Sequence, residues 1–184
     1  AGELVYLQNI IKNNFFQELN LDKQKIIEEA LTKKNTLAEK YLHLLNSHNY
    51  KTEIITDKTP PNFMWIGFIK IFFPNSKIIH CSRDARDNCL SLFKNNFASR
   101  DMEWAHDQND IAQYYNLYLK LISFWKLKSP DSIYEANYES IVSNPEKETR
   151  KLLKFCNLEW DDNCLIFYKK KKTPIQTVSV SQAR

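Results

Sequence analysis

Glycine is nearly absent from the sequence: Gly2 and Gly67 are the only two among 184 residues. A loop that surrounds a phosphate group with its backbone amides needs several glycines close together. The chain as given therefore contains no glycine-rich phosphate loop. This excludes the usual phosphate-binding device of nucleotide kinases from these residues.

Long apolar runs are absent as well. The most apolar helix-like stretch, residues 62–73, is much shorter than the roughly 18–20 residues that cross a bilayer. The first residues lack the basic start and apolar run of a secretory signal, so we expect a cytoplasmic protein with no membrane span. Ala1 is not an initiator methionine, and we expect the chain to be a piece of a longer protein.

The four cysteines, Cys81, Cys89, Cys156 and Cys164, contain no CxxC pair. We expect reduced, buried thiols. The four histidines have no ligand spacing with one another or with cysteine, so no metal site is predicted. A net charge of +4, from 26 basic and 22 acidic residues, permits an anionic ligand without requiring nucleic acid.

The residue patterns predict strands that alternate with helices. β-Branched runs predict strands at 53–56, 77–82 and 132–136, and a helix capped by Asn62 is predicted between the first two. Residues 98–109 are predicted to form a polar surface loop. Further helices are predicted over 4–19, 22–47, 84–97, 109–128, 144–156 and 161–167. This order is typical of an α/β domain with a parallel sheet flanked by helices, here one domain over 1–184.

Cations follow the first two predicted strands, Lys58 after the first and Arg83 after the second. Ligands of open parallel sheets bind beyond the carboxyl ends of the strands, so these cations would lie side by side and bind an anion. Ser91 follows Arg83 by eight residues, which places the two directions about 80° apart around a helix. A guanidinium, a hydroxyl and the unpaired amides of a helix start suit a phosphate monoester. The alternative is that Arg83 pairs with Asp84 or Asp87 and that Ser91 is a solvated helix residue.

Three other features each allow a functional and a plain structural interpretation. Lys58 can neutralise charge on a transferring group or be an exposed loop lysine. Tyr138 follows the third predicted strand and can stack on a base, although a tyrosine at the rim of the core is more common. The lysine run 169–172 can bind phosphate or nucleic acid, but no aromatic residue interleaves it, which favours a solvated run.

Four motifs carry a family resemblance. They are DKTPPNFMWIGFIKIFFPNSKIIHCSRDARDNCLS, YYNLYLKLISFW, YEANYESIVSNPEKETRKLLKFCNLEWDDNCLIFY and TPIQTVSVSQAR. In this order they resemble the sulfotransferases that use 3′-phosphoadenosine 5′-phosphosulfate (PAPS). The resemblance reaches back to AGEL at the start and covers nearly the whole chain. It is strongest to the bacterial group often joined to tetratricopeptide repeats, which is similar to tyrosylprotein sulfotransferases.

The resemblance implies roles for residues that match the family's motifs. Arg83 and Ser91 match the pair that binds the 3′-phosphate of the nucleotide. Tyr138 matches the tyrosine that contacts adenine. Lys58 matches the catalytic lysine that stabilises the transferring sulfuryl group, and Ser179 matches a serine of the same site.

The base is the last implied role. Glu3, in AGEL, falls at or one residue from the carboxylate that deprotonates the acceptor hydroxyl in the tyrosylprotein branch. The cytosolic branch has a histidine two residues after the lysine; Pro60 occupies that position here and excludes it. The family's 5′-phosphosulfate loop, expected just before AGEL, and the segment expected after SQAR are not in this chain. The implied fold is a three-layer P-loop-like α/β domain, incomplete at both ends.

We therefore expect an enzyme that uses PAPS as co-substrate, without a metal, and transfers a sulfuryl group to a hydroxyl or amine. A protein tyrosine, a carbohydrate and a small molecule all stay open as the acceptor, and no nucleic-acid partner is expected. Tetratricopeptide repeats can be attached in the full-length protein. Two alternatives are a non-catalytic nucleotide-binding relic that serves as an interaction module and a nucleoside kinase, which would need a glycine-rich loop and a magnesium ligand.

Overall fold

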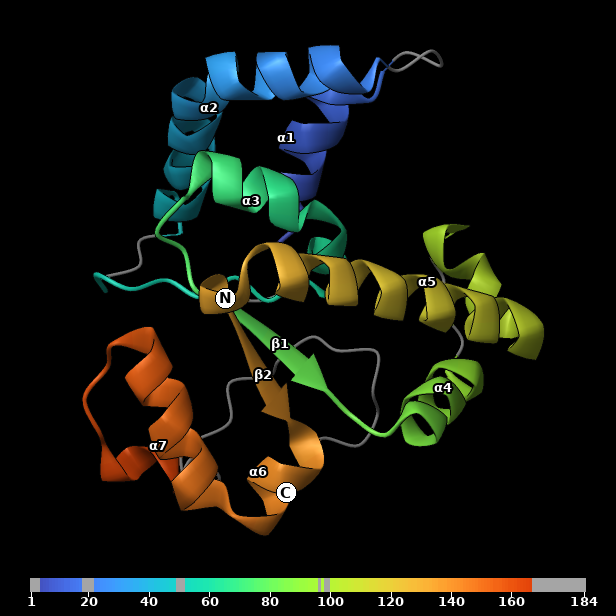
Figure 1. Cartoon of the computed structure of the whole chain (residues 1–184), viewed down its shortest axis with the longest axis vertical. Coiled ribbons are helices and arrows are strands. Elements are labelled where there is room, and N and C mark those ends of the chain that lie inside the picture. The colour runs from blue at the N-terminus through green and yellow to red at the C-terminus, as the bar shows by residue number, and fades with distance from the viewer. Residues whose placement is uncertain (1–3, 18–21, 49–51, 96, 98–99, 167–184) are drawn as a thin grey trace. The chain divides into compact units, whose positions relative to one another are not determined.

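The computed structural model describes residues 4–17, 22–48, 52–95, 97 and 100–166. The chain divides into two compact units, Ala1–Ser76 and Lys77–Arg184. Figure 1 labels the helices and strands of both units. No helix among the described residues is long and apolar enough to cross a membrane. The single domain over 1–184 stays a prediction.

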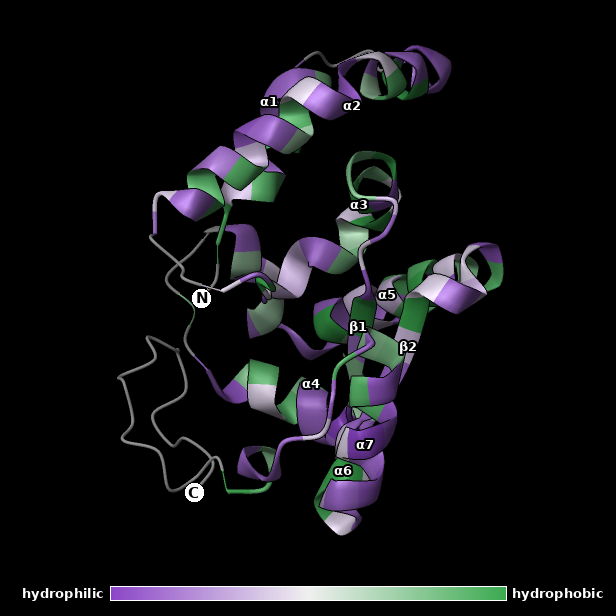
Figure 2. Cartoon of the chain, turned by 90° about the vertical axis from the view of Figure 1, so that its left-hand side faces the viewer, coloured by the Kyte–Doolittle hydropathy of each residue, from purple (hydrophilic) through white to green (hydrophobic). Residues whose placement is uncertain are grey.

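The first unit is helical. Its elements are α1 (Tyr6–Phe15), α2 (Lys23–Asn46), the 3-10 helix η1 (Pro60–Trp65) and α3 (Ile66–Phe72). Asp22 begins α2, because its carboxylate accepts hydrogen bonds from the amides of Gln24 (2.9 Å) and Lys25 (3.3 Å). In Figure 2 hydrophobic and hydrophilic segments alternate along α1 and α2, as expected for helices with one buried face. The helices predicted near 4–19 and 22–47 are confirmed.

An apolar cluster holds the first unit together. Its buried members are Leu4, Leu7, Ile10, Ile11, Phe15, Ala30, Leu37, Tyr41, Leu45 and Phe72. Phe15 of α1 also stacks on Phe68 of α3, with ring centroids 5.1 Å apart. Because α1, α2 and α3 all contribute to one cluster, removal of apolar area from water stabilises their packing against each other.

Two predictions for the first unit are wrong. The sheet in the described part of the chain has two strands, and residues 53–56 form neither of them. The Thr52 hydroxyl donates instead to the Ile54 carbonyl at 3.1 Å, a local bond that competes with strand pairing. Asn62 does not begin a helix, because η1 already begins at Pro60, whose fixed φ and missing amide suit a first helical position.

The second unit contains the sheet. Its elements are β1 (Ile78–Ser82), α4 (Ala85–Lys94), η2 (Arg100–His106), α5 (Gln108–Lys128), η3 (Pro130–Ser132), β2 (Ile133–Asn137), α6 (Tyr138–Ser143), α7 (Pro145–Cys156) and η4 (Asp162–Cys164). The predicted strands 77–82 and 132–136 are confirmed. The predicted loop over 98–109 is wrong where η2 lies. α7 ends as predicted, at Asn157 with a left-handed φ of 57°.

Strands β1 and β2 pair in parallel, with Ile78 opposite Ile133 and Ser82 opposite Asn137. Successive side chains of a strand point to opposite faces of the sheet. On one face His80 bonds to Tyr118 of α5. On the other face the Tyr134 ring lies 5.3 Å from the ring of Phe155 in α7. Helices therefore cover both faces, and Figure 1 shows α5 and α7 on different sides of the strands.

A polar network joins both strands to α5. His80 Nδ1 lies 2.7 Å from a carboxylate oxygen of Glu135, its cross-strand partner, and His80 Nε2 bonds to the Tyr118 hydroxyl. Lys126 of α5 also pairs with Glu135. Burial raises the pKa of Glu135, but hydrogen bonds from Lys126, Ser82 and His80 outweigh it and lower the pKa to about 2. The network therefore fixes the strand register against the crossover helix.

The second unit thus has the predicted fold class, an α/β layered structure with a parallel sheet flanked by helices.

The prediction of buried thiols is wrong for Cys81, which is exposed, while Cys89, Cys156 and Cys164 are half-buried. Cys81 lies on the β1 face opposite His80, and the helix that covers this face contacts β2. Although Cys81 is exposed as a residue, partial desolvation of its thiol raises the pKa of that thiol, so it is not activated.

Candidate functional site

The two strands end side by side in the second unit. Ser82 and Asn137 are register partners and the last residues of β1 and β2. The next residues, Arg83 and Tyr138, therefore both follow the carboxyl edge of the sheet. Ligands of parallel sheets bind at this edge.

The Arg83 guanidinium lies over the Tyr138 ring, 5.2 Å from the ring centroid. Arg83 Nη2 is also 3.2 Å from Oδ2 of Asp87, in the first turn of α4. The two side chains of this ion pair are 43% and 58% exposed, and such pairs contribute about 0–1 kcal/mol. The alternative pairing of Arg83 with an aspartate is present, and it is weak enough for an incoming anion to replace it.

The start of α4 has fewer unpaired backbone amides for binding an anion than predicted. The Asp84 carboxylate accepts hydrogen bonds from the amides of Arg86 (2.9 Å) and Asp87 (3.2 Å), and the Asp84 amide donates to Glu139 (2.9 Å). The amide of Asp87 and the Arg86 side chain are the main reasons that the pKa of Asp84 is lowered. The prediction of unpaired amides here is wrong, because an acidic cap satisfies them. Side chains would have to bind an anion at this place.

Ser91 lies on the exposed surface of α4, four residues after Asp87. Residues four apart on a helix are neighbours on one face. Since Arg83 reaches Asp87, the guanidinium and the Ser91 hydroxyl lie toward the same side of α4. Arg83, Ser91 and Tyr138 thus belong to one unit, and the structure brings Arg83 and Tyr138 into direct contact.

Lys58 belongs to the first unit, where its two neighbours fix the backbone. Asp57 accepts a hydrogen bond from the Tyr41 hydroxyl of α2 at 2.7 Å. Thr59 is 8% exposed, and its hydroxyl donates to the Leu4 carbonyl at 2.8 Å. Burial and the Asp57 carboxylate together raise the pKa of Tyr41. Lys58 itself is exposed, between two residues that the helical core holds in place.

Two predicted catalytic residues, Glu3 and Ser179, lie outside the described residues, as does the lysine run 169–172. Leu4, which follows Glu3, bonds through its carbonyl to Thr59, which follows Lys58. This bond joins the described residues Leu4 and Thr59, and the proximity of Glu3 to Lys58 stays a prediction. Lys58 and Arg83 belong to different units, so their proximity stays a prediction.

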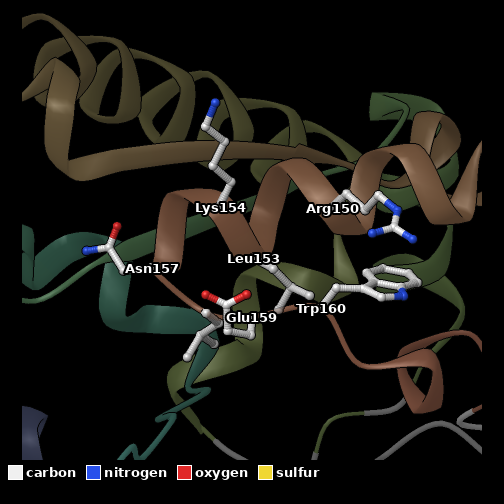
Figure 3. A pocket seen from close by; sticks show the side chains of 7 residues that line it. Arg150, Leu153, Lys154, Asn157, Glu159 and Trp160 are labelled. Carbon is white, nitrogen blue, oxygen red and sulfur yellow. The ribbon is translucent and has the colours of Figure 1, made fainter.

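A separate pocket of about 430 Å³ lies at the end of α7 (Figure 3). It is lined by Arg150, Leu153, Lys154, Asn157, Leu158, Glu159 and Trp160. Arg150 stacks on Trp160, with 3.8 Å from the guanidinium carbon to the ring centroid, and pairs with Glu146 at 2.8 Å. Of the predicted site residues that the structure describes, Lys58, Arg83, Ser91 and Tyr138, none lines this pocket. The described residues also contain no group of three histidine, cysteine, aspartate or glutamate side chains that could hold a metal ion.

Sequence reasoning missed the residues that hold the candidates in place. Glu139 is not among the site residues that the sequence predicts, although it directly follows Tyr138 and accepts a hydrogen bond from the amide of Asp84. Thr59 was also missed, although it lies between Lys58 and Pro60. Thr59 is buried and bonds to Leu4, but the sequence around a polar loop residue shows neither its burial nor a hydrogen-bond partner far away in the chain.

A family profile and several known proteins are similar in sequence to this chain. The sequence profile described as "Sulfotransferase family" matches residues 7–162. An uncharacterized protein of Aquifex aeolicus (strain VF5) is 35% identical over 159 residues, which cover 85% of this chain and 20% of that protein. Protein-tyrosine sulfotransferase 1 of Danio rerio is 23% identical, over 81% of this chain and 41% of that protein.

A third relative is protein-tyrosine sulfotransferase A of Caenorhabditis elegans. It is 24% identical over 136 residues, which cover 71% of this chain and 34% of that protein. The chain thus spans between 20% and 41% of the lengths of these three relatives.

Proposed function

The chain belongs to the sulfotransferase family, and we propose that it forms part of an enzyme that transfers a sulfuryl group from PAPS to an acceptor hydroxyl. The observation that carries the proposal is the contact between Arg83 and Tyr138 beyond the ends of two paired strands. A 3′-phosphoadenosine group joins an aromatic base and a phosphate through one ribose. An aromatic ring beside a guanidinium offers complementary chemistry to both parts.

In this proposal Arg83 and Ser91 bind the 3′-phosphate, and Tyr138 contacts adenine. The exposed Arg83–Asp87 pair opens when the phosphate binds, since a dianion with several acceptor oxygens competes well against one carboxylate. Asp87 and the neighbouring carboxylates then limit the net positive charge of the site. The affinity for the 3′-phosphate therefore depends more on the placement of the Arg83 guanidinium than on the net charge around the site.

The transfer step is assigned to Lys58, Glu3 and Ser179 through the resemblance. The acceptor oxygen forms a bond to sulfur while the bond from sulfur to the bridging phosphate oxygen breaks. Glu3 takes the acceptor proton, and Lys58 offsets the charge that develops on the departing oxygen. The products are a sulfate ester and 3′-phosphoadenosine 5′-phosphate (PAP). The relatives named as protein-tyrosine sulfotransferases make a tyrosine hydroxyl the first acceptor to test.

Calorimetric titration of the full-length protein with PAP tests the nucleotide site. We expect Arg83→Ala to weaken binding by at least about tenfold, because a charge-assisted contact is lost. Arg150→Ala is the matched control, since Arg150 also stacks on an aromatic ring and pairs with a glutamate four residues away. If Arg83→Ala binds PAP as tightly as Arg150→Ala, the 3′-phosphate assignment is wrong.

A sulfuryl-transfer assay with labelled PAPS and a tyrosine peptide tests catalysis. We expect Lys58→Ala to lower the rate about 10²–10³-fold while PAP still binds, because the lysine acts on charge that develops during transfer. Lys40→Ala, an exposed lysine of α2, is the control. PAP binding without transfer to any tyrosine, carbohydrate or small alcohol would instead favour the non-catalytic nucleotide-binding alternative.

A further inference from the structure

Glu139 connects the turns that follow the two strands. It is the second residue of α6, and its Oε1 accepts a hydrogen bond from the amide of Asp84, 2.9 Å away. Its Oε2 accepts a second hydrogen bond from Asn137 Nδ2, also at 2.9 Å. One carboxylate therefore bonds to the β1–α4 turn with one oxygen and to the end of β2 with the other. The amide of Asp84 is the main reason that the pKa of Glu139 is lowered, so the carboxylate stays ionised.

Asn137 completes this arrangement. Its side-chain oxygen accepts a hydrogen bond from the amide of Ser140 at 2.8 Å and so begins α6. Its side-chain amide is left to donate to Glu139. Asn137 is also the register partner of Ser82, the last residue of β1. The side chains of Asn137 and Glu139 thus extend the pairing of β1 and β2 beyond the last backbone ladder position.

The two residues of the nucleotide site are direct neighbours of this link. The amide of Asp84 belongs to the same planar peptide unit as the carbonyl of Arg83, so a bond to that amide orients the Arg83 backbone. Tyr138 precedes Glu139 in the first turn of α6. Neither the guanidinium nor the phenol is held in place by burial, since both side chains are exposed. Their contact therefore depends on how the two turns are fixed.

We propose that Glu139 is a positioning residue that fastens the Arg83 turn to the Tyr138 turn and so preorganises the pair for the 3′-phosphoadenosine group. This inference rests on the proposed function. It assigns Glu139 no contact with the nucleotide. A preorganised pair binds more tightly because less conformational freedom is lost on binding.

The charge of Glu139 makes the inference sharply testable. A carboxylate near Arg83 repels a polyanion such as PAP, so if charge alone mattered, removing it would strengthen binding. Positioning predicts the opposite sign. Glu139→Gln separates the two effects, because glutamine loses the charge but keeps a carbonyl oxygen that can accept from the Asp84 amide.

The experiment combines two measurements on the full-length protein. Calorimetric titration gives the PAP affinity, and hydrogen exchange gives the protection of the Asp84 amide. We expect Glu139→Ala to weaken PAP binding about tenfold and to lose Asp84 protection. We expect Glu139→Gln to keep the protection and to bind within about threefold of the parent. Glu146→Ala is the control, since it removes another exposed glutamate that accepts a hydrogen bond, from Arg150 at 2.9 Å.

The outcomes separate this inference from the proposed function. If the parent binds PAP and Glu139→Ala binds it equally well or more tightly, the positioning role is refuted while the nucleotide site stands. The same holds if Glu139→Gln binds as weakly as Glu139→Ala although its Asp84 amide stays protected. If the parent itself binds no PAP, the proposed function fails and the positioning role fails with it.

Discussion

The hydroxyl of Thr59 offers a direct test of how the first unit holds Lys58. Thr59 is 8% exposed, and its hydroxyl donates to the Leu4 carbonyl at 2.8 Å, across 55 residues of sequence. Asp57 Oδ1 lies 3.1 Å from the same hydroxyl. Thr59→Val keeps the shape of the side chain and removes the donor. The Leu4 carbonyl then stays buried without this partner.

The expected cost follows from that burial. A buried acceptor that loses its partner costs about 1–3 kcal/mol, because it cannot recover a hydrogen bond to water. Thr32→Val in α2 is the matched control. The Thr32 hydroxyl also donates to a carbonyl at 2.8 Å, that of Glu28, but Thr32 is exposed. The Glu28 carbonyl can bond to water after the substitution, so we expect a change within about 0.5 kcal/mol.

Hydrogen exchange of the α1 and α2 amides measures the stability of the first unit without requiring the whole protein to unfold in one step. A loss of 1–3 kcal/mol corresponds to exchange that is about 5–150-fold faster in Thr59→Val. We also expect slower sulfuryl transfer, because Lys58 is the next residue and loses its fixed backbone. Equal exchange rates in Thr59→Val and Thr32→Val would refute the reasoning.

Two further predictions concern the second unit. The pKa of Glu135 is about 2 in the folded protein, so its stabilising contribution is present above the unfolded value of about 4.5 and is lost as the pH falls toward 2. In Glu135→Gln the free energy of unfolding should therefore fall less steeply between about pH 4.5 and pH 2. Urea titrations at a series of pH values measure this dependence, and the same slope in the parent and the variant would contradict the prediction. Asn157→Ala should lower the free energy of unfolding by about 1 kcal/mol whereas Asn157→Gly should not, because φ is 57° there. Equal thermal shifts for the two variants would show that the left-handed cap is unimportant.

Local patterns predicted most of the elements. The strands at 77–82 and 132–136 and the long helix at 109–128 follow from β-branched runs and from helical spacing. The end of α7 at Asn157 followed from local chemistry alone. The strand expected at 53–56 failed because a strand exists only where another backbone pairs with it. A β-branched run cannot show whether such a partner is present.

The candidate site divides in the same way. The positions of Arg83 and Tyr138 after strand ends, and the family motifs that contain them, could be read from the sequence. The expectation of unpaired amides at the start of α4 was wrong. The amide of Asp84 donates a hydrogen bond to the carboxylate of Glu139, which lies 55 residues away in the sequence. The spacing of residues along α4 cannot show that a side chain of α6 bonds to the start of α4.

The sequence by itself therefore determined the alternation of helices and strands, the family, and the residue types of a candidate nucleotide site. These depend on short-range preferences and on ordered motifs that one chain carries in its own residues. Only the tertiary structure decided that Arg83 lies over Tyr138, that Thr59 holds the loop around Lys58, and that Glu139 joins two turns. Each of these is a contact between segments far apart in the chain. Such contacts form because packing and strand register bring the segments together.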